Sequence, residues 1–238
     1  MEKKRLVVLT GAGMSVESGL STFRGGGGLW DNYPVEAVAS AEGFRSNPAL
    51  VLEFYNKRRK ELYSVEPNLG HKLIAALEKN NEVVVITQNV DNLHERAGSS
   101  NVIHLHGELE KVCSSKNPAD LSCVRRLTPD APEIFMGDLA ADSSQLRPYI
   151  VFFGEAVPLM SAAIDALSGA DVFLVIGTSL NVYPAAFLLD YIPSTVPVYL
   201  IDPNDVAHRG GNNVTHIREG ASAGMQYFID KILKQLQN

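Results

Sequence analysis

The sequence predicts an α/β fold with a mainly parallel sheet and a smaller inserted module. Short apolar runs rich in β-branched residues recur along the chain, nearly continuous rather than alternating, as expected of strands buried on both faces. Helical patterns separate several of these runs, which is typical of parallel strands joined by helices. The stretch 110–147 has weak helix and strand signals and several turn formers, such as Asn117-Pro118 and Thr128-Pro129, which indicates an insertion.

The individual elements follow from these patterns in chain order. The first strand is RLVVLT at 5–10, and helices are expected at 48–62 and 70–80. Strands follow as EVVVIT at 82–87, NVIHL at 101–105 and PYIVFF at 148–153. Helices at 161–168, 183–191 and 223–236 then alternate with the strands DVFLVIGT at 171–178 and PVYLID at 197–202.

Length, charge and cysteine content exclude several classes of protein. The 238 residues suit one large domain, or one domain with a smaller insertion. The net charge of -6 argues against general binding of nucleic acid. Two cysteines, Cys113 and Cys123, are too few for a disulfide framework and fit a reducing compartment. The apolar run 6–9 is too short for a signal peptide, and no stretch reaches the roughly 18 apolar residues of a membrane span, so we expect a cytoplasmic protein.

A glycine turn, Gly11-Ala12-Gly13, directly follows the first strand. Small residues here let backbone N–H groups approach a phosphate, which predicts a cradle for a dinucleotide. A plain turn is the alternative, because the third glycine of the dehydrogenase fingerprint would fall at Val16. Further on, Phe23 and Arg24 precede four glycines at 25–28, a pattern typical of a lid over a ligand or of a disordered loop.

Polar side chains follow two of the predicted strands. Gln88, Asn89 and Asp91 come after the strand at 82–87, and ligands bind at the carboxyl ends of parallel strands. Taken singly, Asn89 or Asp91 is equally well explained as a helix cap or turn residue. After the next strand, His106 is a candidate general base, because an unperturbed pKa of about 6.5 suits proton transfer at neutral pH. His104 is the competing candidate.

Five blocks of the sequence together resemble the sirtuins, the NAD-dependent protein lysine deacylases. The blocks are GAGMSVESGLSTFRG, TQNVDNLHERAG, HLHGEL, VFFGEAVP and GTSLNVYPA, and in this order they cover nearly the whole chain. The resemblance implies a single catalytic domain over 1–238, with a Rossmann-like, mainly parallel sheet, helices on both faces and a smaller inserted module. The Rossmann-like part would comprise about 1–25, 68–109 and 148–238, and the module about 26–67 and 110–147.

The resemblance also implies roles for the residues at the strand ends. His106 would be the catalytic base, and Asn89 and Asp91 would be catalytic while also holding the ribose and nicotinamide of NAD beside Gln88. The backbone of the segment around Val151, Phe153, Gly154 and Glu155 would pair with the acylated protein as an added strand, a mode that ignores most substrate side chains. The remaining implied NAD contacts are Gly11, Ala12, Gly13, Phe23, Arg24, Gly177, Thr178, Ser179 and Ala221.

One implied NAD contact departs from the family. Where many sirtuins have an asparagine, YLIDPND has Asp202, with Asn204 two residues on, so both are candidates for the contact with the adenosine ribose. Asp202 has the oxygens to accept hydrogen bonds from both ribose hydroxyls. It would therefore disfavour a phosphorylated ribose by charge repulsion.

In the implied chemistry NAD is consumed as a co-substrate. The acyl oxygen attacks C1′ of the ribose as nicotinamide leaves, and His106 accepts a proton from the ribose hydroxyls. The products would be nicotinamide, free lysine and O-acyl-ADP-ribose. Two alternatives use the same NAD site: mono-ADP-ribosyl transfer to protein, and an NAD-sensing module without turnover, against which the intact His106, Asn89 and Asp91 argue.

The helix expected at 48–62 carries a further signature. Tyr55 and Arg58 are three residues apart and share one helix face, and one sirtuin class has such a Tyr-x-x-Arg pair in the helix that lines its acyl tunnel. An arginine fork pairs bidentately with a carboxylate and a tyrosine hydroxyl adds another bond, so the pair predicts removal of succinyl and malonyl as well as acetyl groups. The alternative is a solvated cationic helix in which Arg58 pairs with Glu61.

Zinc is not expected. Many sirtuins hold a zinc ion in the small module with four cysteines, whereas Cys113 and Cys123 alone cannot complete a tetrahedral site. No histidine lies between 113 and 147, and the spacing of the acidic residues there singles out no ligand set. The module must then be held by its own apolar core. The sequence carries no signal for the oligomeric state.

Overall fold

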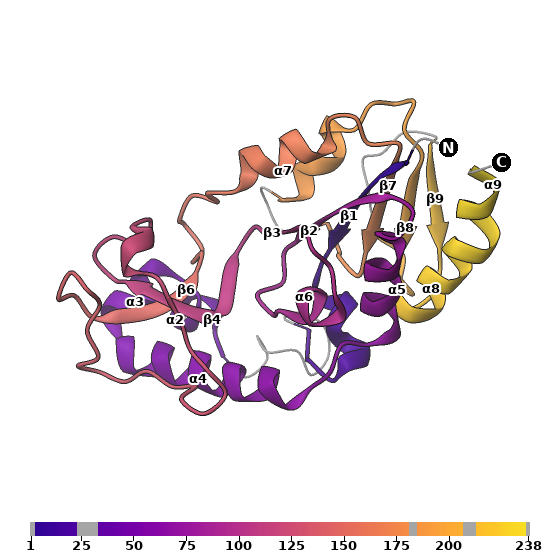
Figure 1. The fold of residues 1–238 in the computed structure, drawn as a ribbon. Coiled ribbons are helices and arrows are strands. Elements are labelled where there is room, and N and C mark those ends of the chain that lie inside the picture. The colour runs from indigo at the N-terminus through magenta and orange to yellow at the C-terminus, as the bar shows by residue number, and fades with distance from the viewer. Residues whose placement is uncertain (1–2, 23–32, 181–184, 207–212, 237–238) are drawn as a thin grey trace.

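The computed structural model describes residues 3–22, 33–180, 185–206 and 213–236, which form two sheets (Figure 1). The larger sheet has six parallel strands in the order β3-β2-β1-β7-β8-β9, which confirms the predicted parallel sheet. Within this sheet, every strand except β9 lies on a run that the sequence predicted as a strand. The strands are β1 (Arg5–Thr10), β2 (Glu82–Thr87), β3 (Val102–His104), β7 (Val172–Ile176), β8 (Val198–Ile201) and β9 (Val214–Ile217).

Both faces of this sheet are buried, which explains the near-continuous apolar runs. Along β1, Leu6 and Val8 face one side and Val7 and Leu9 the other, and all four are fully buried. Helices cover both sides, as predicted (Figure 1). One side carries α5 (Leu69–Leu77), α8 (Ala221–Tyr227), the π-helix η4 (Phe228–Leu233) and α9 (Lys234–Leu236), and the other carries α7 (Met160–Leu167) and the 3-10 helix η3 (Ala185–Tyr191).

The second sheet is antiparallel and has three strands in the order β5-β4-β6. Its strands are β4 (Gly107–Ser114), β5 (Arg125–Arg126) and β6 (Leu146–Ile150). Since β3 ends at His104 and β4 begins at Gly107, only Leu105 and His106 separate the two sheets along the chain. The helices that accompany this sheet are α2 (Val35–Val38), α3 (Ala41–Ser46), α4 (Pro48–Ser64) and the short η2 (Leu121–Cys123).

Grouping the run at 148–153 with the parallel strands is wrong. The strand there, β6, ends at Ile150 and pairs antiparallel with β4. The partner strand β4 reads GELEKVCS and was largely missed, because charged residues such as Glu110 and Lys111 interrupt its apolar pattern. Its pairing with β6 is irregular between Gly107 and Val112, which further separates it from the regular parallel strands.

The predicted helices are present, with two changes of type, since the helix predicted at 223–236 contains the π-helix η4. The longest, α4, begins at Pro48, whose missing N–H suits the first helical position, and Asn47 Oδ1 accepts a hydrogen bond from Leu50 N at 3.2 Å. At 183–191 the described part is the 3-10 helix η3 rather than an α-helix. The short elements α2, α3, α6 (Leu93–Ala97) and η1 (Ala12–Ser18) were not predicted. Within the described ranges, no helix combines the length and apolarity needed to cross a bilayer.

Candidate active site

A cleft of about 540 Å³ lies at the carboxyl ends of the parallel strands, where they meet α4 and the segment after β6. This volume is typical of a small-molecule site. Arg58 and Asp91 line an adjoining cavity of about 20 Å³, which shares Ala12, Asn89 and Val90 with the cleft. Phe23 and Arg24 lie outside the described residues. The predicted site residues that line the cleft are Gly11, Ala12, Gly13, Tyr55, Gln88, Asn89, His106, Val151, Phe153, Gly154, Glu155, Gly177, Thr178, Ser179, Asp202, Asn204 and Ala221.

The glycine turn after β1 packs against the turn after β7. Gly13 N donates a hydrogen bond to Gly177 O at 2.8 Å, and a Cβ on Gly13 would come within 2.6 Å of Gly177 Cα. Gly177 has a φ of +61°, and a Cβ there would come within 2.3 Å of Met14 N. The glycine that completes this turn is therefore Gly177, which follows β7, rather than a residue at position 16. Although β7 is far from β1 along the chain, the two strands are neighbours in the sheet. The result is a backbone-walled cradle that any side chain would fill, and it fits a dinucleotide.

His106 presents one ring nitrogen to the cleft. Its Nδ1 lies 3.0 Å from Gln88 O, and because a carbonyl oxygen only accepts, Nδ1 carries the proton. The Nε2 lone pair is then left for the cleft that His106 lines. Burial lowers the pKa of His106 and the bond to Gln88 O opposes this, so the ring is neutral at pH 7 and able to accept a proton.

His104 is held differently, which separates the two candidate bases. Its Nδ1 lies 3.2 Å from Asn89 O and its Nε2 lies 2.7 Å from Glu95 Oε1, so both ring nitrogens are engaged. The side chain is buried and does not line the cleft. Burial alone would lower the pKa of His104, but the hydrogen bond and charge of Glu95 outweigh it and raise the pKa. Of the two histidines, only His106 is free to act as a base.

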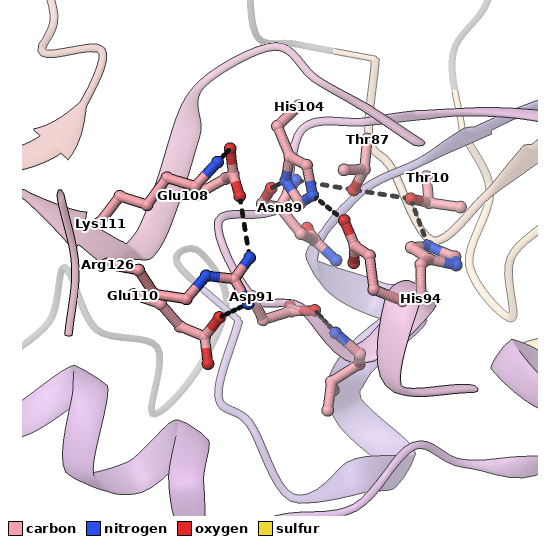
Figure 2. Close-up of polar contacts among 12 residues, drawn as sticks. Thr10, Thr87, Asn89, Asp91, His94, His104, Glu108, Glu110, Lys111 and Arg126 are labelled. Carbon is pink, nitrogen blue, oxygen red and sulfur yellow. Dashed lines mark hydrogen bonds and ion pairs between the residues drawn. The ribbon is translucent and has the colours of Figure 1, made fainter. Parts of the chain in front are cut away.

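Asn89 and Asp91 are joined through Ser15, which sequence reasoning missed. Asn89 Nδ2 donates to Gly11 O at 3.0 Å and to Ser15 Oγ at 3.2 Å. Ser15 Oγ in turn donates to Asp91 Oδ2 at 2.9 Å, and Asp91 Oδ1 accepts from Leu93 N at 3.2 Å. Burial raises the pKa of Asp91, and these two donated hydrogen bonds oppose that rise. Figure 2 shows Asn89 and Asp91 beside the His104 contacts.

Tyr55 and Arg58 both turn inward from α4, with exposed fractions of 6% and 7%. Tyr55 lines the cleft, and its hydroxyl makes no hydrogen bond to the part of the chain that the structure describes. Burial raises the pKa of Tyr55, so the hydroxyl remains a donor. Arg58 Nη1 donates to Glu61 Oε2 at 3.1 Å, so the ion pair of the alternative interpretation is present. Burial lowers the pKa of Arg58, and Glu61 and Asp91 oppose this.

Asp202 and Asn204 lie together at the end of β8. Asp202 Oδ1 accepts hydrogen bonds from Asn204 N at 2.9 Å and from Asn204 Nδ2 at 3.2 Å. Both residues line the cleft, so both remain candidates for a ribose contact. Glu17, another residue that sequence reasoning missed, lines the same region, and its Oε1 accepts from Ser222 N at 3.1 Å in the first turn of α8.

The segment after β6 is already partly paired. Phe153 N donates to Ala39 O at 2.8 Å, while Phe153 itself is 47% exposed. Glu155 is bound by Arg147 through contacts of 2.7 and 2.9 Å and accepts from Phe152 N at 2.8 Å. Glu155 therefore fixes the shape of this segment, and its carboxylate is not free for a substrate.

The two cysteines are buried free thiols. Burial raises the pKa of Cys113 to about 11, so it remains protonated at neutral pH. Among the described residues, no group of three or more His, Cys, Asp and Glu side chains is arranged to hold a metal ion.

Comparison with known proteins gives a consistent result. The model of the Sir2 family matches residues 11–184. A protein of Bacteroides thetaiotaomicron named NAD-dependent protein deacylase is 60% identical over 223 residues, which cover 94% of this chain and 95% of that protein. A Helicobacter pylori protein of the same name is 49% identical over 231 residues, which cover 97% of this chain and 98% of that protein. A solved structure of a mutant Sir2 homologue in complex with ADP-ribose is similar with a TM-score of 0.86 and 36% identity, over 99% of this chain and 94% of that chain.

Proposed function

The chain belongs to the Sir2 family and is an NAD-dependent protein deacylase, and we propose that it removes acidic acyl groups, succinyl and malonyl, as well as acetyl groups. The observation that carries this proposal is the placement of Tyr55 and Arg58. Both are buried on α4 beside Asn89, one lining the cleft and the other the cavity that adjoins it. An acyl chain that enters beside Asn89 would bring its terminal carboxylate to a guanidinium and a phenol donor.

The ion pair between Arg58 and Glu61 does not oppose this proposal. Arg58 is buried, but the side chain of Glu61 is 41% exposed, so water can solvate Glu61 when a substrate carboxylate takes its place. Charged hydrogen bonds made inside the cavity are worth about 1.5 to 3 kcal/mol each. A substrate carboxylate would therefore displace Glu61, with a preference of roughly ten- to a hundredfold over an uncharged acyl group.

The catalytic assignments form part of the proposal. NAD would supply the ribose carbon that the acyl oxygen attacks as nicotinamide leaves, and one water would then release the lysine, so that the products are nicotinamide, free lysine and O-acyl-ADP-ribose. His106 is the base, supported by its unprotonated Nε2 at the cleft. Asn89 and Asp91 hold the nicotinamide and ribose, supported by their buried hydrogen bonds to Ser15. His106→Ala is expected to abolish deacylation and leave the fold intact, and retained NAD-dependent turnover would remove this assignment.

Other residues of the cleft would bind the two substrates. The glycine cradle of Gly11, Ala12 and Gly13, with the facing turn of Gly177, Thr178 and Ser179, would hold the pyrophosphate and a ribose, and Gln88, with Phe23 and Arg24, would complete the nicotinamide side. Asp202 or Asn204 and Ala221 would meet the adenosine. The backbone around Val151, Phe153 and Gly154 would pair with the acylated protein, with Glu155 fixing its shape. The small module would be held without zinc.

The test compares two peptides that differ only in carrying acetyl-lysine or succinyl-lysine. We would measure kcat/KM for each at saturating NAD, for wild type, Arg58→Met and the matched control Lys57→Met, which removes an exposed cation from the same helix. Wild type should turn over the succinyl peptide at least as well as the acetyl peptide. Arg58→Met should lower succinyl turnover by roughly ten- to a hundredfold and spare acetyl turnover, while Lys57→Met should change neither.

Two results would contradict the proposal. Strong preference for acetyl in wild type would mean that α4 does not recognise an acidic acyl group. Equal losses on both peptides in Arg58→Met would make Arg58 a structural residue that supports Asp91 and Glu61. In either case the NAD-dependent deacylase activity would stand, because it does not depend on the acyl preference.

A further inference from the structure

His104 and His106 hold two consecutive carbonyl groups of the loop that follows β2. His106 Nδ1 binds Gln88 O at 3.0 Å, and His104 Nδ1 binds Asn89 O at 3.2 Å. The two rings differ at the other nitrogen, because His106 faces the cleft whereas His104 Nε2 lies 2.7 Å from Glu95 Oε1 on α6. Figure 2 shows His104 between the loop and α6.

The partners of His104 require a charged ring. A backbone carbonyl and a carboxylate are both acceptors, and a neutral imidazole has only one N–H to donate. Only the imidazolium form satisfies both contacts at once. A charge buried to this degree is stable only with a close counter-ion, and Glu95 is that counter-ion.

We propose that His104 and Glu95 form a positioning pair that holds Asn89 and Asp91 in the arrangement used for deacylation, and that the pair acts only while His104 is charged. This inference rests on the catalytic roles proposed above for Asn89 and Asp91. His104 does not reach the cleft, so it acts through these residues. Neither His104 nor Glu95 has a part in the assigned chemistry.

Asp91 gives the charge of His104 a specific consequence. Both oxygens of Asp91 accept hydrogen bonds, from Ser15 Oγ and from Leu93 N, which suits the ionised carboxylate. Burial favours the neutral acid instead, and the nearby positive charge of His104 offsets part of that cost. Loss of the charge would leave one N–H for two acceptors, Asn89 O and Glu95 Oε1, and would favour protonation of Asp91.

The other ionisable groups around the pair reinforce Glu95 as the main partner. His94 Nε2 lies 3.0 Å from Thr10 Oγ1, which itself donates to Thr87, so His94 is a neutral donor whose pKa burial lowers far below its usual value. The charge of Glu108 is largely balanced by Lys111 and Arg126 within the small sheet (Figure 2). The groups that face the pair are His71 on α5, His94 on α6, Asp91 after β2, Glu108 on β4 and Arg126 on β5.

The experiment is the pH dependence of kcat/KM for NAD at a saturating acetyl-lysine peptide, which needs no acidic acyl recognition. In wild type, kcat/KM should fall at low pH because His106 becomes protonated and can no longer act as a base. It should also fall at high pH because His104 loses its positive charge. Glu95→Gln keeps an acceptor for His104 but removes the counter-ion. Its alkaline limb should move to lower pH by roughly 1 to 3 units, with the acid limb and the peptide KM unchanged.

The matched control is Glu66→Gln, which removes a surface ion pair to Arg96 on the same helix α6. Its pH profile should superpose on that of wild type. His104→Gln is a second variant, because its amide can still donate to Asn89 O but does not titrate. Because the pair carries no positive charge in that variant at any pH, kcat/KM for NAD should be low across the whole pH range and show no alkaline limb.

The proposal is overturned if the pH profile of Glu95→Gln superposes on that of wild type. It is also overturned if kcat/KM for NAD falls by the same factor at every pH and the alkaline limb does not shift. The second result would describe a merely structural pair. Failure of the proposed catalytic roles is distinguishable, because it would appear as turnover retained in His106→Ala at all pH values, whatever the behaviour of Glu95→Gln.

Discussion

Asp202 places a negative charge where a cofactor ribose is expected. One of its oxygens is occupied by the two donors of Asn204, which leaves the other for a ligand. Glu17 lines the same cleft, and no Lys or Arg does so among the described residues. A phosphate on the adenosine ribose would therefore meet carboxylates rather than a cation, and such like-charge contacts cost several kcal/mol.

We expect wild type to use NAD far better than NADP, and Asp202→Asn to narrow the ratio of their kcat/KM values about tenfold, because it removes one full charge. The measurement is turnover of one acetyl-lysine peptide with each dinucleotide. Asn204→Ala is the comparison variant. If Asn204→Ala changes the ratio and Asp202→Asn does not, the ribose contact belongs to Asn204.

Gln88 and Asn89 could be placed in the cleft from sequence because ligands bind at the carboxyl ends of parallel strands, and the family resemblance added Asp202 from the end of another strand. From the residues alone the choice between His104 and His106 stayed open, and only the family resemblance pointed to His106. In the structure His106 lines the cleft, whereas His104 does not and is held by Glu95. Ser15 was missed because its partner Asp91 is 76 residues away in the chain.

At the scale of elements, the carboxylate of Asp142 helps to hold the link between β5 and β6 to the end of β4. Asp142 Oδ2 accepts from Ser114 Oγ at 2.6 Å, and Asp142 Oδ1 accepts from Ser144 N at 3.0 Å and Ser144 Oγ at 2.7 Å. These hydrogen bonds lower the pKa of Asp142 to about 2. Because the folded pKa is depressed, the stabilisation is present above the ordinary carboxyl pKa and is lost as the pH falls toward 2.

Asp142→Asn should therefore lower the free energy of unfolding at pH 7, and the difference from wild type should shrink as the pH is lowered. Urea unfolding at a series of pH values measures this difference. Asp130→Asn, an exposed residue of the same link, is the matched control and should show little effect at any pH. A difference for Asp142→Asn that stays constant with pH would mean that the charge of Asp142 does not stabilise the link.

Strands buried on both faces could be predicted well, whereas β4 and β9 could not. The run of β1 is apolar throughout, whereas β4 places Glu108 and Lys111 at part-exposed positions and so loses the signal. The edge strand β9 is four residues long and mostly part-exposed or exposed, and it was also missed. Pairing partners such as those of β6 depend on contacts between distant segments, which no local pattern contains.

At the scale of the whole molecule, the cleft depends on how the two sheets are joined. The connection is close at Gly107, where φ is +85° and a Cβ would come within 2.1 Å of Tyr149 O on β6. His106 precedes this residue, so the same backbone that turns from one sheet to the other sets the position of the proposed base. Any loosening of the small module would therefore reach the site directly.

The small module must then be rigid, and its apolar core can supply that rigidity without a metal. Leu52 from α4 packs with Val112, Leu127, Ile134 and Leu146 in one buried cluster. We expect purified protein to contain no stoichiometric zinc, and a strong chelator to leave both Tm and NAD-dependent deacetylation unchanged, as metal analysis, thermal unfolding and turnover would measure. A four-cysteine sirtuin treated in parallel should lose both. One zinc per chain that leaves with the chelator and lowers Tm would show instead that a metal completes the module.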